Sequence, residues 1–259
     1  MILIYFLSTL ALVITAPIVT IVIGGSCVIA AIFHVKDRAG SVYDLAPRWW
    51  SKIVLFMTGV RVTVHNSERA LDGKPHVYVS NHISWYDIPA LASFLPRTKF
   101  VAKAELFKLP VFGPAMRAVG MVPVDRQNRK AAFASYDVAA GQIRDGNSVI
   151  VFPEGTRGFD YRLRPFKKGP FVLAIAAGVP IVPILTHGTL EVIGKGSMWV
   201  HPGKVDIHLL EPVSVEGFGY DDREALASAV SSRIAEALDR LYGINCAAPD
   251  VIQSSTAEI

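Results

Sequence analysis

The chain has 259 residues, of which 51% are hydrophobic, and its formal net charge is only +4. This length is enough for one domain, or for two small ones, with a substantial buried core. The two cysteines, Cys27 and Cys246, show no metal-ligand spacing, so the composition supports neither a disulfide nor a metal site.

Residues 1–33 contain no charged side chain, and this apolar stretch is long enough to cross a membrane. Pro17 and the Gly24-Gly25 pair divide it, so a single tilted helix and a re-entrant pair of short helices both fit the sequence. A cleaved secretory signal fits poorly, because no basic residue precedes the stretch and the stretch is too long. Four cations follow within residues 36–52, and the positive-inside rule therefore predicts that the rest of the chain is cytoplasmic.

The next segment, residues 45–56, combines two adjacent tryptophans with basic neighbours. Trp49 and Trp50 lie between Arg48 and Lys52, a pattern typical of a helix at a bilayer interface. Packing of the two tryptophans in the core explains the pattern equally well.

Beyond residue 58, short apolar runs alternate with helical patterns. The expected strands are residues 60–64, 77–80, 99–102, 120–124, 148–152, 182–185 and 205–210. The expected helices are residues 84–95, 103–109, 133–143, 169–176 and 226–241. This alternation predicts an α/β fold with a mixed central sheet flanked by helices. We expect a membrane-anchoring helical segment (1–58), an α/β domain (59–246) and a disordered tail (247–259).

The stretch Ser80–Asp87 places a histidine and a carboxylate directly after an apolar strand. Ser84 and Asp87 have the spacing of a capping box, which predicts that a helix begins near Ser84. His82 then lies in the preceding turn, where it can fold back over the first helical turn and contact Asp87. Asp87 would hold one ring nitrogen and leave the other free as a base. Taken alone, an isolated pair at this spacing more often has only a structural role, with Asp87 capping helix amides.

Four sequence blocks together resemble the glycerolipid acyltransferase family, which contains the lysophosphatidic acid acyltransferases of phospholipid synthesis. In the family's order, the blocks are Asn81-His82 to Asp87, Gly120 to Arg126, Phe152 to Arg157, and Val179-Pro180-Ile181-Val182-Pro183. The histidine, the aspartate, the glutamate and both arginines match the family's pattern. The resemblance implies an N-terminal segment embedded in one leaflet. It also implies acyl transfer without a cofactor, from acyl-CoA or acyl carrier protein as the thioester donor.

The resemblance gives the histidine and the aspartate a chemical role. In acyl transfer, a hydroxyl loses its proton as it attacks a thioester carbonyl. Neutral His82 would take that proton, and Asp87 would orient the ring and stabilise the imidazolium that forms. Ser84 is the alternative nucleophile, but a helix-cap serine has its oxygen committed to backbone amides. We therefore expect direct transfer to an incoming hydroxyl.

The centre of the chain is basic, since residues 95–170 contain 14 Lys or Arg against 6 Asp or Glu, a local net charge of 14 − 6 = +8. The absence of a basic helix or an interleaved aromatic motif points to lipid and donor phosphates, and not to nucleic acid. Arg126 and Arg157 each offer a planar fork of donors to a phosphate. The alternatives are surface ion pairs of Arg126 with Asp125 and of Arg157 with Glu154.

The remaining expected substrate-binding residues flank these arginines and the histidine. Glu154 is expected either to accept hydrogen bonds from glycerol hydroxyls or to position an arginine. Gly155 would allow close approach of the backbone. Asn81, Lys103 and Thr156 complete the expected set.

The resemblance implies a membrane-bound enzyme that acylates the sn-2 hydroxyl of 1-acylglycerol-3-phosphate at the cytoplasmic face of the inner membrane. The expected partners are the bilayer, the lysophospholipid acceptor and the acyl thioester donor. Other acceptors, such as a lyso-ornithine lipid or another lysophospholipid, remain open. Two hypotheses from other classes are a membrane hydrolase acting through Ser84 and a non-catalytic lipid-binding protein.

Overall fold

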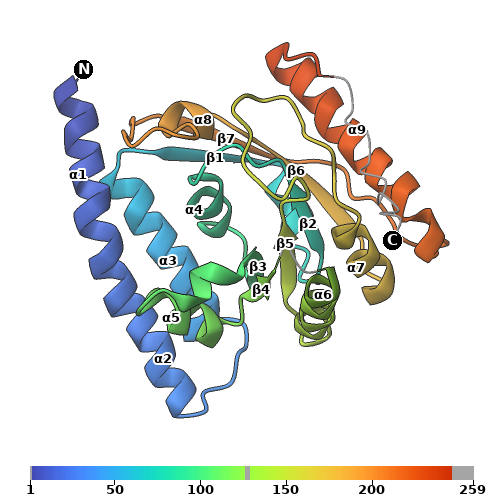
Figure 1. The fold of residues 1–259 in the computed structure, drawn as a ribbon, viewed down its shortest axis with the longest axis horizontal. Helices are drawn as coiled ribbons and strands as arrows, with labels where there is room; N and C mark the ends of the chain where they lie inside the picture. The colour runs from blue at the N-terminus through green and yellow to red at the C-terminus, as the bar shows by residue number, and fades with distance from the viewer. Residues whose placement is uncertain (1, 126–128, 247–259) are drawn as a thin grey trace, which may run out of the picture.

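The structure, a computed structural model, describes residues 2–125 and 129–246. The expected tail of residues 247–259 lies outside the described residues. Within the described part, seven strands form one sheet in the order β1-β7-β6-β2-β5-β3-β4. Neighbouring strands are parallel, except for β6 and β7, which are antiparallel (Figure 1). The prediction of a mixed central sheet flanked by helices is thus confirmed.

The strands follow the apolar runs of the sequence closely. They are β1 (Arg61–His65), β2 (Val77–Ser80), β3 (Thr98–Lys103), β4 (Val122–Val124), β5 (Ser148–Val151), β6 (Ile181–His187) and β7 (Lys204–Leu209). The central strands β2 and β5 are buried along their whole length. Helices therefore cover both faces there, as is usual for parallel strands.

Helical elements supply the two outer layers. They are α1 (Ile2–Val19), η1 (Thr20–Gly24), α2 (Gly25–Ile32), α3 (Val42–Met57), η2 (Ser67–Ala70), α4 (Asp87–Ala92), η3 (Ala104–Lys108), α5 (Phe112–Val119), α6 (Arg129–Arg144), α7 (Gly169–Ala177), α8 (Thr189–Val192), η4 (Tyr220–Asp222) and α9 (Arg223–Tyr242). Helices α6, α7 and α9 lie on one side of the sheet, and α3, α4 and α5 lie on the other (Figure 1). Several elements differ from the expectation: residues 104–108 form a 3₁₀ helix, and the sequence patterns do not predict η2, α5, α8 or η4.

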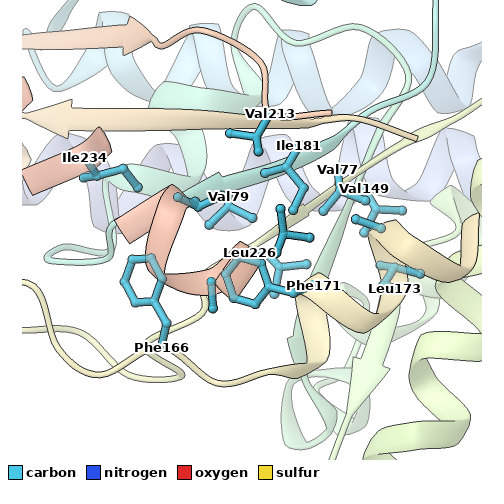
Figure 2. Close-up of a cluster of buried hydrophobic side chains, with 14 of the residues drawn as sticks. Val77, Val79, Val149, Phe166, Phe171, Leu173, Ile181, Val213, Leu226 and Ile234 are labelled. Carbon is cyan, nitrogen blue, oxygen red and sulfur yellow. The ribbon is translucent and has the colours of Figure 1, made fainter. Parts of the chain in front are cut away.

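The larger hydrophobic core lies between the sheet and helices α7 and α9. Figure 2 shows Phe171 and Leu173 of α7 and Leu226 of α9 packed on β2, where they meet Val77 and Val79. A second core on the opposite face joins α3 and α4 to the sheet. Because the two cores pack against opposite faces of the central strands, the loops at the ends of these strands start from rigid positions.

The N-terminal apolar stretch forms one continuous helix from Ile2 to Ile32, with the π-helical turn η1 in its middle. It has 31 residues and is apolar enough to cross a membrane by length and composition. Of the two arrangements that fit the sequence, the structure has the single helix and not the re-entrant pair. Pro17 lies inside α1, and the wider π turn that follows it absorbs the local distortion.

This long helix packs against the domain along much of its length (Figure 1). The indole Nε1 of Trp50 donates to Thr20 Oγ1 at 2.9 Å, and a Cβ at Gly24 would lie 2.8 Å from that of Ala115. Trp49, in contrast, is 56% exposed, with the Lys52 ammonium 5.5 Å from its ring centroid. The packing alternative therefore describes Trp50, whereas Trp49 faces outward and its place at a bilayer interface stays a prediction.

Candidate active site

The carboxylate of Asp87 is the centre of a hydrogen-bond network at the end of β2. Its Oδ2 accepts from His82 Nδ1 at 2.7 Å and from the amides of Ile83 and Ser84 at 2.8 and 2.9 Å. Its Oδ1 accepts from the Thr189 hydroxyl at 2.5 Å. Asp87 is fully buried. Four donors thus surround one buried carboxylate, which can balance the charge of an imidazolium.

The helix that carries Asp87 begins later than the capping-box spacing predicts. Helix α4 starts at Asp87 and not near Ser84, although the Asp87 carboxylate accepts from the Ser84 amide as in a capping box, and from the Ile83 amide as well. The Ser84 hydroxyl donates to the Ile193 carbonyl at 2.8 Å and accepts from the Tyr86 amide at 3.1 Å. Ser84 is also fully buried, so its oxygen is engaged on both sides and is poorly placed to act as a nucleophile.

The imidazole of His82 is held in one orientation from three sides. Its Nδ1 faces Asp87, and the ring stacks on Phe152 with centroids 4.1 Å apart. The backbone amide of His82 donates to Glu154 Oε1 at 2.8 Å. A proton on Nδ1 satisfies the carboxylate and leaves the lone pair on Nε2. Among the described residues, none makes a hydrogen bond to Nε2. That atom is therefore available to accept a proton.

Glu154 lies behind His82, where it accepts backbone hydrogen bonds. Its second oxygen accepts from the Arg164 amide at 3.3 Å, and only 5% of the residue is exposed. The side chain thus positions the backbone of His82 and Arg164, and it does not reach Arg157. Burial raises the pKa of Glu154 to about 8, and the two backbone hydrogen bonds partly oppose this shift.

A cavity of about 220 Å³ opens beside the histidine and is bordered by cations. His82, Lys103, Thr156 and Arg157 all line it. The guanidinium of Arg157 lies over Trp85, 4.9 Å from the ring centroid, and no ion pair joins it to Glu154 in the described residues. Lys103 is half exposed and lies 3.2 Å from Glu105. Basic groups and the imidazole therefore share one cavity.

Two other expected site residues have positions that fix the backbone. Asn81 is buried, and its amide exchanges two hydrogen bonds with the backbone of Thr186, at 2.8 and 2.9 Å. Gly155 has φ +72°, and a Cβ there would lie 2.9 Å from Lys167 Cε. Arg126, the second expected phosphate ligand, lies outside the described residues.

Comparisons with known proteins agree with this geometry. The family model described as Acyltransferase matches residues 61–187. A 1-acyl-sn-glycerol-3-phosphate acyltransferase from Haemophilus influenzae is 32% identical over 218 residues, which are 81% of this chain and 89% of that protein. The chain belongs to the acyltransferase family. The family resemblance inferred from the four sequence blocks is therefore confirmed.

Two further relatives define how far this acyltransferase match extends. The crystal structure of the 1-acyl-sn-glycerophosphate acyltransferase PlsC from Thermotoga maritima superimposes with a TM-score of 0.77 at 29% identity, covering 92% of this chain and 96% of that one. A chloroplastic 1-acyl-sn-glycerol-3-phosphate acyltransferase from Brassica napus is 37% identical over 166 residues, which are 64% of this chain. The match spans only 47% of that plant protein.

A second cavity of the acyltransferase adjoins the first and is lined almost entirely by apolar side chains. It has a volume of about 200 Å³ and lies between the N-terminal helix, α3, α4 and α5. Trp85, Ile88 and Leu106 line both cavities. The site thus has a polar side and an apolar side that share one wall.

One group of possible metal ligands lies elsewhere in the described part of the acyltransferase. His65, Asp206 and His208 offer ligand atoms within 4.8 Å of one another. The two imidazoles stack almost parallel, with centroids 4.2 Å apart and an interplanar angle of 7°. His65 Nε2 bonds to Asp206 at 2.8 Å and His208 Nε2 bonds to Tyr242 at 2.7 Å. Stacked rings do not direct both lone pairs at one ion, so hydrogen bonding accounts for this cluster.

Sequence reasoning missed the residues that support the acyltransferase site from behind. Thr186 and Thr189 lie more than 100 positions after Asn81 and Asp87, and no local pattern connects them. The only signal was the block at residues 179–183, which leads into β6, whose end carries Thr186.

Proposed function

We propose that the chain transfers a fatty acyl group from an acyl thioester to the sn-2 hydroxyl of 1-acylglycerol-3-phosphate. The observation that carries this proposal is the His82–Asp87 pair, whose imidazole lines the same cavity as Lys103 and Arg157. The relatives from Brassica napus, Haemophilus influenzae and Thermotoga maritima are named as acyltransferases for this acceptor, which supports the choice. The donor brings its acyl group as an activated thioester, so the reaction needs no cofactor.

The chemistry follows from the orientation of the histidine. Nε2 of His82 takes the proton of the acceptor hydroxyl as its oxygen attacks the thioester carbonyl. The buried Asp87 carboxylate stabilises the imidazolium that forms. The tetrahedral intermediate then expels the thiolate, which takes the proton from Nε2, and the neutral histidine is restored. An acyl-enzyme step is disfavoured because the Ser84 oxygen is engaged with Ile193 and Tyr86.

The cationic residues favour an acceptor with a phosphate monoester. Such a group carries between one and two negative charges near neutral pH. Arg157 presents a planar guanidinium, and Lys103 adds a point charge on the same cavity. Arg126 stays a proposed third ligand, on the resemblance alone.

The apolar cavity offers a place for the transferred acyl chain. Its lining is made mostly of aliphatic and aromatic side chains, and it shares Trp85 and Leu106 with the cavity beside His82. Burial of methylene groups there is favourable, at about 0.8 kcal/mol for each. The N-terminal helix contributes Ile23 and Cys27 to this lining, which links the membrane segment to the substrate.

We place the N-terminal helix within one leaflet, with the domain on the cytoplasmic side. Contacts occur near both ends of the helix: Thr9 Oγ1 accepts from the Val200 amide at 2.9 Å, and Gly24 meets Ala115. An upright span would therefore pull the polar domain into the hydrocarbon, which is costly. Next to the helix, the exposed Met198 (83%) and Trp199 (50%) extend the apolar surface.

Acceptor-dependent thiol release tests this function. The purified full-length chain is mixed with an acyl-CoA and one lysolipid at a time: lysophosphatidic acid, lyso-ornithine lipid or lysophosphatidylethanolamine. We expect thiol release only when a lysolipid is present, and fastest with lysophosphatidic acid. Release without any lysolipid would indicate a hydrolase, and no release with any of them would favour a lipid-binding protein. Acyl carrier protein replaces acyl-CoA in a second series to identify the preferred donor.

A further inference from the structure

The end of β6 and the turn into α8 lie directly behind the histidine–aspartate pair. Thr186 binds the side chain of Asn81, the neighbour of His82, through its own backbone amide and carbonyl. Three residues later, Thr189 donates its hydroxyl to Asp87. One short segment therefore contacts the catalytic stretch on both sides of the histidine.

The two oxygens of Asp87 are bonded unequally. Oδ2 has three donors, whereas Oδ1 has the Thr189 hydroxyl alone among the described residues. Both Asp87 and Thr189 are fully buried, so water does not replace a missing donor without rearrangement. Loss of the hydroxyl would leave a buried carboxylate oxygen without a partner, which is costly and frees the carboxylate to rotate.

The turn that presents Thr189 is itself rigid. Gly188 has φ +93°, and a Cβ there would lie 2.2 Å from the Lys204 carbonyl oxygen. The Gly188 amide donates to the Tyr161 hydroxyl at 2.8 Å, and that hydroxyl donates to Glu191 at 2.5 Å. Threonine is also β-branched, which restricts its side-chain rotation. The hydroxyl of Thr189 is therefore held in a fixed position before Asp87 meets it.

We propose that Thr189 is a positioning residue for acyl transfer, which acts by fixing the Asp87 carboxylate in the orientation that holds Nδ1 of His82. This inference rests on the proposed function. It also gives the block at residues 179–183 a physical role, because that block leads into the strand whose end supports the catalytic pair.

Three substitutions of Thr189 in the full-length chain test the proposal. Thr189→Val removes the hydroxyl at constant shape, Thr189→Ser keeps it, and Thr189→Cys leaves only a weak donor. Thr98→Val is the matched control, since Thr98 is also buried and its hydroxyl, within the described part of the chain, bonds only to the Pro96 carbonyl at 3.0 Å, away from the site. Each variant is assayed for kcat, for the KM of the acceptor and for the pH profile of kcat/KM.

We expect Thr189→Val to lower kcat by about 10- to 100-fold, the range expected for one hydrogen bond to a charged group. The acceptor KM should change little. Thr189→Ser should recover most of the rate, and Thr98→Val should match the wild type. If Thr189→Val does not fold, Thr189→Cys is assayed in its place. Its kcat should be lower than that of Thr189→Ser and higher than one tenth of the wild-type kcat. A wild-type kcat in the valine or cysteine variant, or an equal loss in the serine variant, would overturn the proposal.

A second measurement needs no substrate and therefore separates this inference from the proposed function. Carbethoxylation of His82 by diethylpyrocarbonate is followed across pH by peptide mass spectrometry, because only the neutral imidazole reacts. Without the Thr189 hydroxyl, the carboxylate is free to turn away from Nδ1 and stabilises the imidazolium less, so the midpoint of the reaction should move to lower pH in Thr189→Val and not in Thr189→Ser. An unchanged midpoint would contradict the inference, whichever acceptor the wild type prefers.

Discussion

The two sides of the His82 ring differ in burial and in bonding. Behind the ring lies the buried support, which consists of Asn81, Asp87, Glu154, Thr186 and Thr189, all at most 5% exposed and all hydrogen-bonded. In front lies the cationic rim of Lys103, Thr156 and Arg157, which lines the cavity and is partly or largely exposed. On the proposed function, we expect the buried support to fix the geometry of proton transfer and the rim to adapt to a headgroup. We therefore expect that the rate of the reaction and the choice of acceptor can be changed separately.

Removing the base should have the largest effect. We expect His82→Ala to lower kcat by about 10³-fold, because general-base catalysis commonly contributes 10²- to 10⁴-fold. The fold should persist, since the ring is held by the support and does not itself hold the support together. Thiol release and thermal unfolding are measured together, with His34→Ala, an exposed histidine outside the site, as the control. Normal turnover by His82→Ala would rule out the mechanism.

Changing Asp87, the partner of the base, should lower kcat less than removing the base does. We expect Asp87→Asn to lower kcat by about 10²-fold and to lower stability by about 1–3 kcal/mol, because an amide NH₂ would face one of the four donors. Asp44→Asn is the matched control: Asp44 is also buried and accepts from the amides of Gly40 and Arg97. That control should lose stability and keep its kcat. Equal kcat losses in both variants would show that stability alone explains the effect.

A substitution in the cationic rim should change the KM of the acceptor and leave kcat nearly unchanged. We expect Arg157→Lys to raise the KM for lysophosphatidic acid by about tenfold and to leave kcat within about twofold, because lysine keeps the charge but loses the planar fork. The KM of the thioester donor should change less. Arg162→Lys is the control, since Arg162 is 82% exposed and lies outside the cavity lining. A tenfold fall in kcat at constant KM would place Arg157 in the reaction itself.

The smallest expected effect concerns the stability of the support across pH. Burial raises the pKa of Glu154 from 4.5 to about 8, so the folded state holds a proton that the unfolded state releases between these values. Stability from this group is therefore lost as pH rises from about 4.5 to about 8. We expect Glu154→Gln to flatten that decline in urea unfolding series. Glu105→Gln should not flatten it, because a backbone hydrogen bond lowers the pKa of Glu105. Parallel wild-type and Glu154→Gln curves would contradict the assignment.

The two regions also differ in how well the sequence predicts them. The strands follow apolar runs, and the contact of His82 with Asp87 follows from a turn five residues long, so both are local signals. The contacts of Thr186 and Thr189 are not local in the sequence. These residues reach the site only because β6 pairs with β2, and no sequence pattern around a threonine predicts such a contact. Helix α4 also begins later than the capping-box spacing predicts: the Asp87 carboxylate accepts from the Ser84 amide as in a capping box, but the Ser84 hydroxyl bonds to the distant Ile193 carbonyl and to the Tyr86 amide.

The separation of reaction from acceptor choice is tested most directly by a selectivity ratio. The ratio is kcat/KM for lysophosphatidic acid divided by kcat/KM for lysophosphatidylethanolamine, with one acyl-CoA as the donor. It is measured in the wild type, in Asp87→Asn and in Arg157→Lys. We predict a ratio well above one in the wild type, the same ratio at a lower absolute rate in Asp87→Asn, and a ratio that falls by about tenfold in Arg157→Lys. A wild-type ratio below one, or a ratio that changes in Asp87→Asn and stays constant in Arg157→Lys, would contradict the account.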